Sequence, residues 1–399
     1  MSDLSKGWRR VKLGDVAINS TAVSANPEAE GFERYIIGKN IPEDADRIET
    51  WGPVGDSDFG PRIRTIFQPG DVICTTRGPK LKVARADLRG LGAHTNFYLR
   101  TADSNTLLQP YLEAVVRSRG FRQHLVNNFR GSVNLFVNWS DAAEYKFALP
   151  PLEEQRRIVE VLKVSSTVAE SHKALASQLI ALKASATEAL VSGTNSKSCS
   201  IGQLCSMQNG KAFPGGEYCD DGIRLLRPGN LAPTGYLSWN MEKTVCMPER
   251  YQEEAAEHIV DSGDVLINLT AQSLEDGFMG RVCLARDGDM SLLNQRIGRF
   301  ENFSDQVLPE YLYRVLQSQR FLRHAVAMCE GSKIKHLFWD HISRFEFPLP
   351  TLTRQSMVVQ ILGSIDSTIQ RARVRHAASQ VWKSQLLSSA MDASAGDSR

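Results

Sequence analysis

The stretch Leu149-Pro150-Pro151-Leu152-Glu153-Glu154-Gln155 decides the organisation of this chain, because it occurs twice. A second copy, Leu349-Pro350-Thr351-Leu352-Thr353-Arg354-Gln355, follows at an offset of 200 residues. When residues 108–162 are placed over 308–362 without a gap, 18 of 55 positions are identical. A self-match at a fixed offset informs on architecture before any residue is given a role. Because the offset equals a whole domain plus a helix, the sequence predicts two such units related by internal two-fold symmetry.

Each copy of the stretch opens a segment that we predict to be one long helix. No Gly or Pro occurs between Leu152 and Leu190. Pro151 suits a first helical turn, and the helix dipole favours the acidic pair Glu153 and Glu154 there. At ~1.5 Å per residue, each helix would be roughly 60 Å long. A helix of that length cannot bury its apolar stripe on one small domain.

A heptad pattern indicates how the helices pack. The first helix has Ile158, Ser165, His172, Leu179 and Ala186 at a, and Val161, Val168, Leu175, Leu182 and Ala189 at d. The second helix has Val358, Ile365, Ala372, Ser379 and Leu386 at a, and Ile361, Thr368, Arg375, Trp382 and Ser389 at d. The simplest arrangement is an antiparallel coiled coil of the two helices. The alternative is two separate amphipathic helices, each covering its own domain.

The remainder of each unit is typical of mixed structure. Short β-favouring runs at 34–38, 69–76 and 96–100 are broken by Gly, Pro and Asp, whereas residues 110–129 have helical spacing. Residues 201–347 repeat this plan. We therefore predict an α+β fold with two mixed α/β domains in a tandem pseudo-two-fold repeat, each followed by a long helix. The predicted boundaries are 1–150 for the first domain, 151–193 for its helix, 194–350 for the second domain, 351–392 for its helix, and 393–399 for a disordered tail.

Bulk composition narrows the class of protein. A chain of 399 residues with 42% apolar and 23% charged residues is typical of a globular protein of two or three domains. Neither a secretory signal nor an apolar run of membrane-spanning length is visible. The seven cysteines form no CxxC pair, which favours reduced thiols. We expect a cytoplasmic protein.

The two halves share a frame but differ in charge. Residues 62–130 carry twelve Lys or Arg and four Asp or Glu, a net charge of +8. The matching stretch 262–330 carries seven basic and nine acidic residues, a net charge of −2. Surfaces that differ between two copies of one scaffold are candidates for recognition.

Sequence signatures of catalysis are missing. The chain contains no GxxxxGK[ST], GxGxxG, HExxH or GxSxG pattern. His336 and His341 are the closest histidine pair, and no cysteine completes a ligand set beside them. We predict neither a catalytic nor a metal site, and an enzyme with an unnoticed nucleotide or methyl-donor site remains the alternative.

Polar loops at matching places of the two halves are candidates for nucleic-acid contact. Thr, Arg, Lys, Asn and Gln side chains suit phosphates and base edges. In the first domain the candidates are Thr75, Thr76, Arg77, Lys80, Lys82, Arg130, Ser132 and Asn134. In the second domain they are Asn268, Thr270, Gln272, Arg281, Ser332, Lys333 and Lys335. The alternative for each loop is a solvated turn.

Several of these motifs resemble one known family over the whole chain. The segments Phe147-Ala-Leu-Pro-Pro-Leu-Glu-Glu-Gln-Arg-Arg-Ile-Val and Phe347-Pro-Leu-Pro-Thr-Leu-Thr-Arg-Gln resemble the signature of type I restriction–modification specificity subunits. The stretch from Trp8 to Val16 resembles the opening of the family's domain, and Gly70 to Gly78 resembles its strand-and-loop element. The second signature departs at Thr351, Thr353 and Arg354.

The resemblance implies a non-catalytic subunit for DNA recognition. Each domain would read half of a bipartite target in the major groove, and the paired helices would fix the gap and dock two modification subunits. S-adenosylmethionine would bind to those adenine methyltransferase subunits, so no cofactor is expected in this chain, and a translocating restriction subunit can join. Two alternatives remain: a specificity subunit of a related methylation or phage-defence system without the restriction motor, and a coiled-coil scaffold that does not bind DNA.

Overall fold

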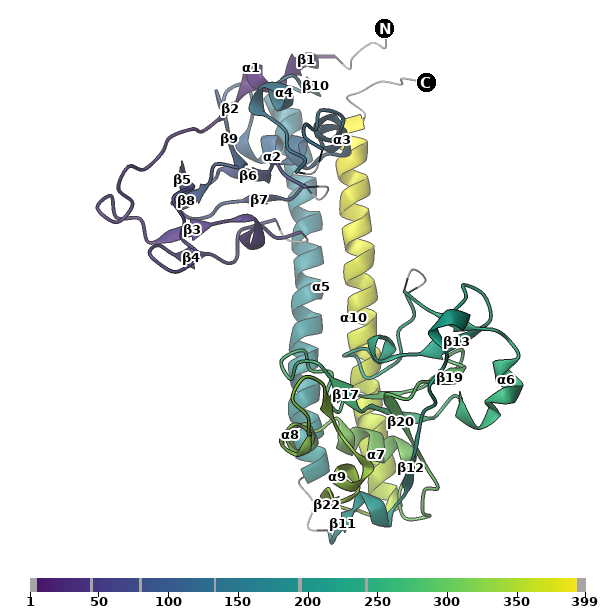
Figure 1. Cartoon of the computed structure of the whole chain (residues 1–399). Coiled ribbons are helices and arrows are strands. Elements are labelled where there is room, and N and C mark those ends of the chain that lie inside the picture. The colour runs from purple at the N-terminus through teal and green to yellow at the C-terminus, as the bar shows by residue number, and fades with distance from the viewer. Residues whose placement is uncertain are drawn as a thin grey trace. The chain divides into compact units, whose positions relative to one another are not determined.

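The computed structural model describes residues 6–43, 46–78, 81–132, 134–192, 196–240 and 243–392 (Figure 1). The chain forms two compact units. The first unit consists of Met1–Lys173 with Arg373–Arg399, and the second of Ala174–Ala372. Each unit therefore contains one mixed domain and a part of both long helices. The predicted tail at 393–399 lies outside the described residues.

The domain of the first unit is built on two four-stranded sheets. One has the order β2-β9-β6-β7 and the other β4-β3-β8-β5, while β1 and β10 pair antiparallel and join the two ends of the domain. The strands are β1 (Arg9–Lys12), β2 (Ala17–Asn19), β3 (Arg34–Ile36), β4 (Gly52–Pro53), β5 (Ile63–Phe67), β6 (Val72–Thr75), β7 (Val83–Arg85), β8 (Gly90–Ala93), β9 (Asn96–Thr101) and β10 (Lys146–Leu149). The helices are α1 (Leu13–Val16), α2 (Gln109–Arg117), α3 (Arg119–Asn127), α4 (Trp139–Ala143) and α5 (Leu152–Ser192).

The second unit repeats this topology. Its sheets have the orders β12-β20-β16-β18 and β14-β13-β19-β15, with the pairs β11-β22 and β17-β21. The strands are β11 (Ser198–Ser200), β12 (Ser206–Asn209), β13 (Ile223–Leu226), β14 (Cys246–Met247), β15 (Ile259–Val260), β16 (Val265–Asn268), β17 (Thr270–Ala271), β18 (Val282–Leu284), β19 (Ser291–Leu293), β20 (Ile297–Glu301), β21 (Lys335–His336) and β22 (Glu346–Pro348). The helices are α6 (Tyr251–Glu254), α7 (Pro309–Leu316), α8 (Gln319–Met328), α9 (Trp339–Ser343) and α10 (Leu352–Asp392). The predicted α+β fold with duplicated domains is confirmed.

The helix expected at 110–129 is interrupted. Ser118 has an extended backbone (ψ 151°), which ends α2 and begins α3. Its hydroxyl accepts a hydrogen bond from the Phe121 N–H at 3.1 Å, so it caps the second helix. Ser318 caps α8 in the same way through Phe321, at 3.2 Å. The identical Ser pair of the repeat thus marks a helix break that apolar periodicity alone did not reveal.

The last residue of the repeated stretch fastens each long helix to its domain. Gln155 is fully buried. Its side-chain oxygen accepts from the Leu108 N–H at 2.9 Å, and its amide donates to the carbonyls of Thr106 at 3.0 Å and Pro150 at 2.9 Å. Gln355 makes the corresponding bonds to Leu308, Gln306 and Pro350. One side chain therefore joins the start of the long helix to the loop before α2 or α7.

The long helices pair antiparallel within each unit (Figure 1). In the first unit, Leu162 near the start of α5 packs with the same core as Leu387 near the end of α10. In the second unit the reverse holds, because Leu190 at the end of α5 shares a core with Val358 at the start of α10. His376 also donates from Nδ1 to the Ala169 carbonyl at 2.9 Å. The predicted pairing is confirmed, and the alternative of two separately packed helices is not observed.

The buried seam differs from the predicted heptad. The a positions hold, since Val358 and Ala372 are buried and Ile158 is half-buried. The d positions Val161, Val168, Leu175, Leu182, Ile361 and Trp382 are instead 40–65% exposed. The seam uses the next residue along each helix, including Leu162, Ala169, Ala176, Leu362 and Ile369. Small alanines let the helices approach closely, and the larger apolar side chains are left on the outside.

We expect Gln155→Ala to lower the free energy of unfolding by about 1–3 kcal/mol, because the Leu108 N–H and two carbonyls lose their partner inside the protein. Chemical denaturation of the full chain measures this loss. The matched control is Gln123→Ala, whose side chain lies on the surface and bonds only Asn127. That variant should stay within about 0.5 kcal/mol of the parent. Equal effects of the two substitutions would contradict the fastening role of Gln155.

Candidate nucleic-acid interface

The two predicted loops of the first domain lie against each other. The Val137 N–H donates to the Thr76 carbonyl at 3.1 Å, and the Gly78 N–H donates to the Leu135 carbonyl at 3.2 Å. Arg130 and Phe136 exchange both backbone hydrogen bonds, which closes the second loop into a narrow hairpin. Gly78 and Gly131 have φ of 79° and 88°, a conformation that glycine adopts without strain. The structure therefore brings together residues more than 50 positions apart.

Four of the predicted side chains in this pair of loops are exposed, and one of them, Arg130, is held in an ion pair. The other three are Arg77, Ser132 and Asn134. Thr75 and Thr76 are buried, at 8% and 6% exposure. Thr76 donates its hydroxyl to the Thr95 carbonyl at 2.5 Å, and Thr75 accepts from the Lys82 N–H at 2.9 Å. These two threonines are therefore placed to shape the loop rather than to touch a ligand.

Two basic candidates of the first domain already have partners. Arg130 makes a two-pronged contact with Asp141, at 3.0 and 2.7 Å. Lys82 donates to the Gly38 carbonyl at 3.3 Å and lies 3.9 Å from Glu43. Lys80 lies outside the described residues. Arg77 is a further basic candidate of this loop pair, and its side chain is exposed.

The equivalent loops of the second domain also meet. They pair as β17 and β21, with Thr270 opposite His336 and Ala271 opposite Lys335. Thr270 and Lys335 are half-buried in this ribbon. The predicted residues Gln272, Ser332 and Lys333 are exposed around it.

The other two candidates of the second domain support the loop from inside. Asn268 is fully buried and donates to the carbonyls of Thr270 at 2.7 Å and Phe278 at 2.8 Å. The Arg281 guanidinium donates to three backbone carbonyls and stacks on Phe278, 4.0 Å from the ring centre. Burial lowers the pKa of Arg281. Direct contact of Asn268 and Arg281 with a ligand is therefore not expected from this geometry.

A polar groove that the sequence reasoning missed lies beside this ribbon. Its cavity of about 650 Å³ is lined by side chains that suit phosphates and base edges, including Arg227, Asn230, Lys243, Gln295 and Arg296. A second, smaller hollow is also lined by Pro228, Gly229 and Arg296 of this groove. Its lining further includes Thr270 and Gln272. Arg227, Gln295 and Arg296 are exposed. Each follows a strand, β13 or β19, in a short polar turn, which is the same signal that singled out Thr75 to Arg77.

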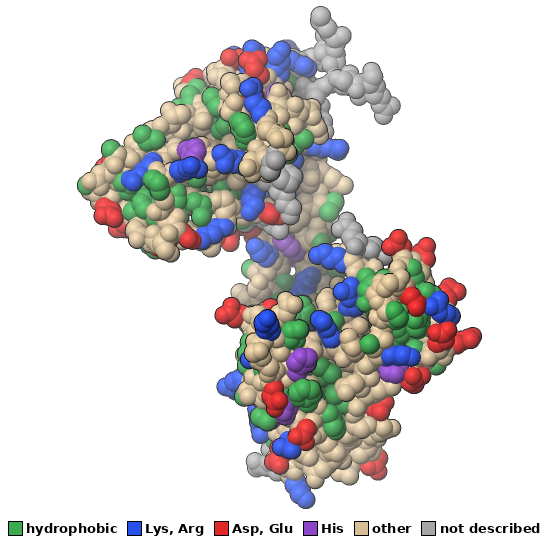
Figure 2. Space-filling model, viewed as in Figure 1, with side chains coloured by type: hydrophobic (Ala, Val, Ile, Leu, Met, Phe, Trp, Pro, Cys, Tyr) green, Lys and Arg blue, Asp and Glu red, His purple; other side chains and the backbone are tan. Residues whose placement is uncertain are grey.

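Acidic side chains of the second domain gather elsewhere. Figure 2 shows them along the edge that carries α6 in Figure 1. The exposed residues there include Asp220, Asp221, Glu249, Glu253 and Glu254. These acidic residues and Arg227 lie outside the stretch 262–330, so the net charge of −2 of that stretch does not describe the surface around the groove. A polyanion would approach the groove of Arg227 and Arg296 rather than this edge.

A family model described as the type I restriction modification DNA specificity domain matches residues 194–375. The MjaVIII type I restriction enzyme specificity subunit of Methanocaldococcus jannaschii is 25% identical over 57% of this chain and 57% of its own length. The EcoAI specificity subunit of Escherichia coli is 23% identical over 44% of this chain and 29% of its own length. Residues 194–375 therefore match the type I restriction modification DNA specificity domain, and the chain is similar to type I specificity subunits. The matched region covers little more than half of the first relative and less than a third of the second.

Solved structures share the fold of this chain over nearly its full length. A chain from a study of complex assembly and conformational transition in a type I system has a TM-score of 0.62 at 19% identity, and 98% and 99% of the two chains are covered. The S subunit from M. genitalium has a TM-score of 0.54 at 14% identity, with 98% and 97% covered. At such identities the likeness concerns the fold, including both domains and both long helices.

Two further findings concern the described residues alone. None of their helices combines the length and apolar character needed to cross a membrane. Their His, Cys, Asp and Glu side chains form no group of three or more that could hold a metal ion.

We expect Asn268→Ala to lower the free energy of unfolding by about 1–3 kcal/mol, because two carbonyls lose a donor inside the loop. Gln272→Ala is the matched control, since it removes an exposed amide four residues away and should change stability by less than about 0.5 kcal/mol. Denaturant unfolding of each full-length variant measures the difference. A stable Asn268→Ala protein would argue against the supporting role.

Proposed function

We propose that this chain recognises a bipartite DNA target with a fixed gap and docks modification and restriction subunits. Each mixed domain binds one half of the target in the major groove. The observation that carries the proposal is the duplicated domain, in which the same loop pair presents different polar residues. The exposed candidates of this loop pair include Arg77, Ser132 and Asn134 in the first domain and Gln272, Ser332 and Lys333 in the second, and of these only the Ser pair is identical.

The chemistry of these exposed groups suits base recognition. Arg pairs with guanine edges through two hydrogen bonds, and Asn or Gln pairs with adenine. Arg77 in the first domain and the set Arg227, Gln295 and Arg296 in the second supply such groups from short turns on rigid strands. Two scaffolds with different polar side chains would read two different half-sites.

The outer face of the helix pair supports docking of the modification subunits. In the first unit, Val161, Val164, Val168 and Trp382 are 44–65% exposed. With their neighbours they line an apolar groove of about 700 Å³ between α5 and α10. An exposed apolar groove of this kind marks a protein contact surface. The occupant that we propose is an apolar helical segment of the adenine methyltransferase subunit.

The chemical steps belong to the partners in this proposal. S-adenosylmethionine binds to the methyltransferase subunits, of which there are two, and a translocating restriction subunit joins the complex. This chain contributes recognition and positioning. A related methylation or phage-defence complex without the restriction motor is the second candidate, since nothing in the helix pair distinguishes the two.

We expect the chain, co-expressed with the methyltransferase of its own operon, to purify as a complex and to select DNA with two short conserved blocks at constant separation. Sequencing of bound random duplexes measures this result. Selection of DNA with one continuous conserved block would contradict recognition of a bipartite target. Absence of any sequence selection would favour a coiled-coil scaffold that does not bind DNA. Calorimetric binding of S-adenosylmethionine to the isolated chain would favour the enzyme alternative.

Arg77→Ala should weaken DNA binding by about 1–3 kcal/mol and relax the preference at one position of one half-site, if the guanidinium contacts a base. Binding titrations against duplexes substituted at each position measure both effects. Arg157→Ala is the control, because Arg157 is 78% exposed in α5, away from the loop pair. An unchanged affinity and unchanged salt dependence for Arg77→Ala would remove Arg77 from the interface.

A further inference from the structure

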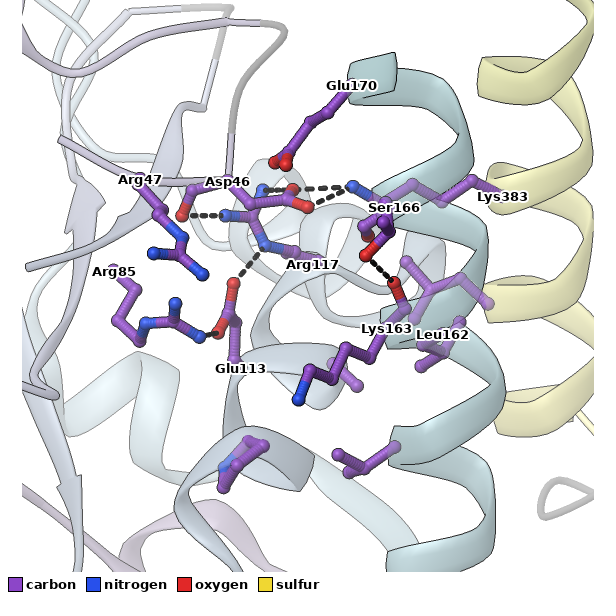
Figure 3. Close-up of a pocket in the computed structure, with 15 residues that line it drawn as sticks. Asp46, Arg47, Arg85, Glu113, Arg117, Leu162, Lys163, Ser166, Glu170 and Lys383 are labelled. Atoms are coloured by element: carbon purple, nitrogen blue, oxygen red, sulfur yellow. Dashed lines mark hydrogen bonds and ion pairs between the residues drawn. The ribbon is translucent and has the colours of Figure 1, made fainter. Parts of the chain in front are cut away.

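A buried carboxylate joins the domain of the first unit to both long helices (Figure 3). Asp46, in the loop after β3, is bonded by Lys383 of α10, with Nζ 2.6 Å from Oδ1 and also in contact with Oδ2. Arg117 at the end of α2 lies 3.4 Å from the same carboxylate and donates to the Asp46 carbonyl at 3.0 Å. The three side chains are 17–19% exposed.

Opposite charges alternate outward from this carboxylate. Arg117 pairs with Glu113 at 3.1 Å, Glu113 with Arg85 at 3.4 Å, and Arg85 with Asp87 at 3.1 Å. The groups surround a cavity of about 390 Å³ between the domain and the helices of this unit. Figure 3 shows Asp46, Arg117 and Lys383 converging on one point, with Ser166 of α5 beside them.

The central carboxylate stays ionised at neutral pH. Burial by itself raises the pKa of Asp46, but the charges of Arg117 and Lys383 and a hydrogen bond from Ser166 outweigh it. The net result is a pKa below the ordinary value of an aspartate. The contact is therefore a charged one at neutral pH.

The second unit has the same arrangement built from different positions. Asp366 of α10 lies 2.6 Å from Lys183 of α5 and 2.6 Å from Arg314 of α7. Tyr236 of the domain donates to the same carboxylate at 2.9 Å. All three charged side chains are less than 15% exposed.

The 200-residue repeat shows which residues of the two sets occupy equivalent positions. Lys183 and Lys383 are equivalent at the offset of 200, and so are Ser166 and Asp366. In both units a helix lysine and a domain arginine from α2 or α7 hold one carboxylate. The carboxylate comes from the domain in the first unit and from the helix in the second. We call each set a carboxylate clamp.

A buried ion pair is a costly way to add stability, because apolar residues of similar volume serve as well or better. The distinctive property of such a pair is its geometric specificity. Hydrogen-bonded charges fix the distance and angle between the two packed elements, whereas apolar contacts allow the elements to slide. The two clamps combine the same types of charged residue, although their carboxylates come from different elements. This recurrence indicates that the orientation of each domain on its helices matters.

We propose that the carboxylate clamps are positioning devices that hold each recognition domain at one angle on its stretch of the helix pair. The spacing preference for the two half-sites then depends on Asp46 and Asp366 as well as on helix length. This inference rests on the proposed DNA recognition. Neither carboxylate contacts DNA in the proposal.

The test uses the full chain in complex with its methyltransferase subunits and the selected target. Asp46→Asn keeps the shape of the side chain and removes the charge. Affinities are measured for the selected gap, for gaps one base pair longer and shorter, and for single base changes within each half-site. We expect discrimination between the selected and altered gaps to fall about tenfold, equivalent to about 1.4 kcal/mol, while base discrimination is retained.

Further variants separate positioning from folding. Lys383→Met should reproduce the loss of gap discrimination, and Lys383→Arg should restore most of it. Asp366→Asn should act in the same way through the second domain. Asp58→Asn is the matched control, because Asp58 forms an exposed pair with Lys39 in the first domain.

Unchanged gap discrimination in folded Asp46→Asn or Lys383→Met protein, with only a lower melting temperature, would overturn the inference and leave the clamp a stabilising contact. If Asp46→Asn does not fold, Lys383→Met and Lys383→Arg decide the question. A parent complex that shows no gap preference would instead refute the proposed bipartite recognition.

Discussion

The need to cover an apolar stripe on a helix of 41 residues governs this molecule. Such a helix extends beyond any single domain of the chain, and its stripe is stable in water only against another helix. Antiparallel pairing of α5 and α10 meets this need, and it does so in each unit by bringing the start of one helix beside the end of the other. Each domain is then attached at the beginning of a helix, through Gln155 or Gln355.

The attachment has two components with different physical character. The buried glutamine satisfies backbone groups near the helix start, so it ties the chain locally and identically in both units. The carboxylate clamp acts about three helical turns further along, at Ser166 or Asp366, and it involves the partner helix as well. Both polar contacts add to the apolar packing of Ile158, Val159 and Leu162 against the core of the first domain, and under the proposal above they set its orientation.

Sequence alone predicted the duplicated fold and the long helices, because a repeat and an uninterrupted helical segment are strong signals. It predicted the a layer of the seam correctly but placed the d layer one residue too early in each heptad. Valine and leucine at 161, 168, 175 and 182 outweigh Ala169 and Ala176 in any hydrophobic pattern. The actual seam depends on close approach of small side chains and on a lysine that is buried through its ion pairs, and neither property is visible in a hydropathy pattern.

The polar loops of the candidate interface were visible in the sequence, but the exposure of their side chains was not. Strand-to-turn transitions rich in polar residues indicated both loop pairs. Whether a threonine or asparagine in such a turn faces outward depends on backbone groups that need a partner, as for Thr76 and Asn268. Arg227 and Arg296 were missed because they lie almost 70 residues apart and only the parallel pairing of β13 with β19 brings their turns together.

The different origins of the two clamp carboxylates limit how this architecture can be recombined. Consider a copy of the second domain placed before α5, in the position of the first domain. Its Arg314 and Tyr236 would then face Ser166 of α5, where its own helix has Asp366. Asp46 would be absent, because it belongs to the domain that was replaced. The reverse graft would crowd Asp46 and Asp366 around one lysine. The two positions are thus not equivalent, and under the proposed function a recognition domain would be exchanged more readily between matching positions of related proteins than within one chain.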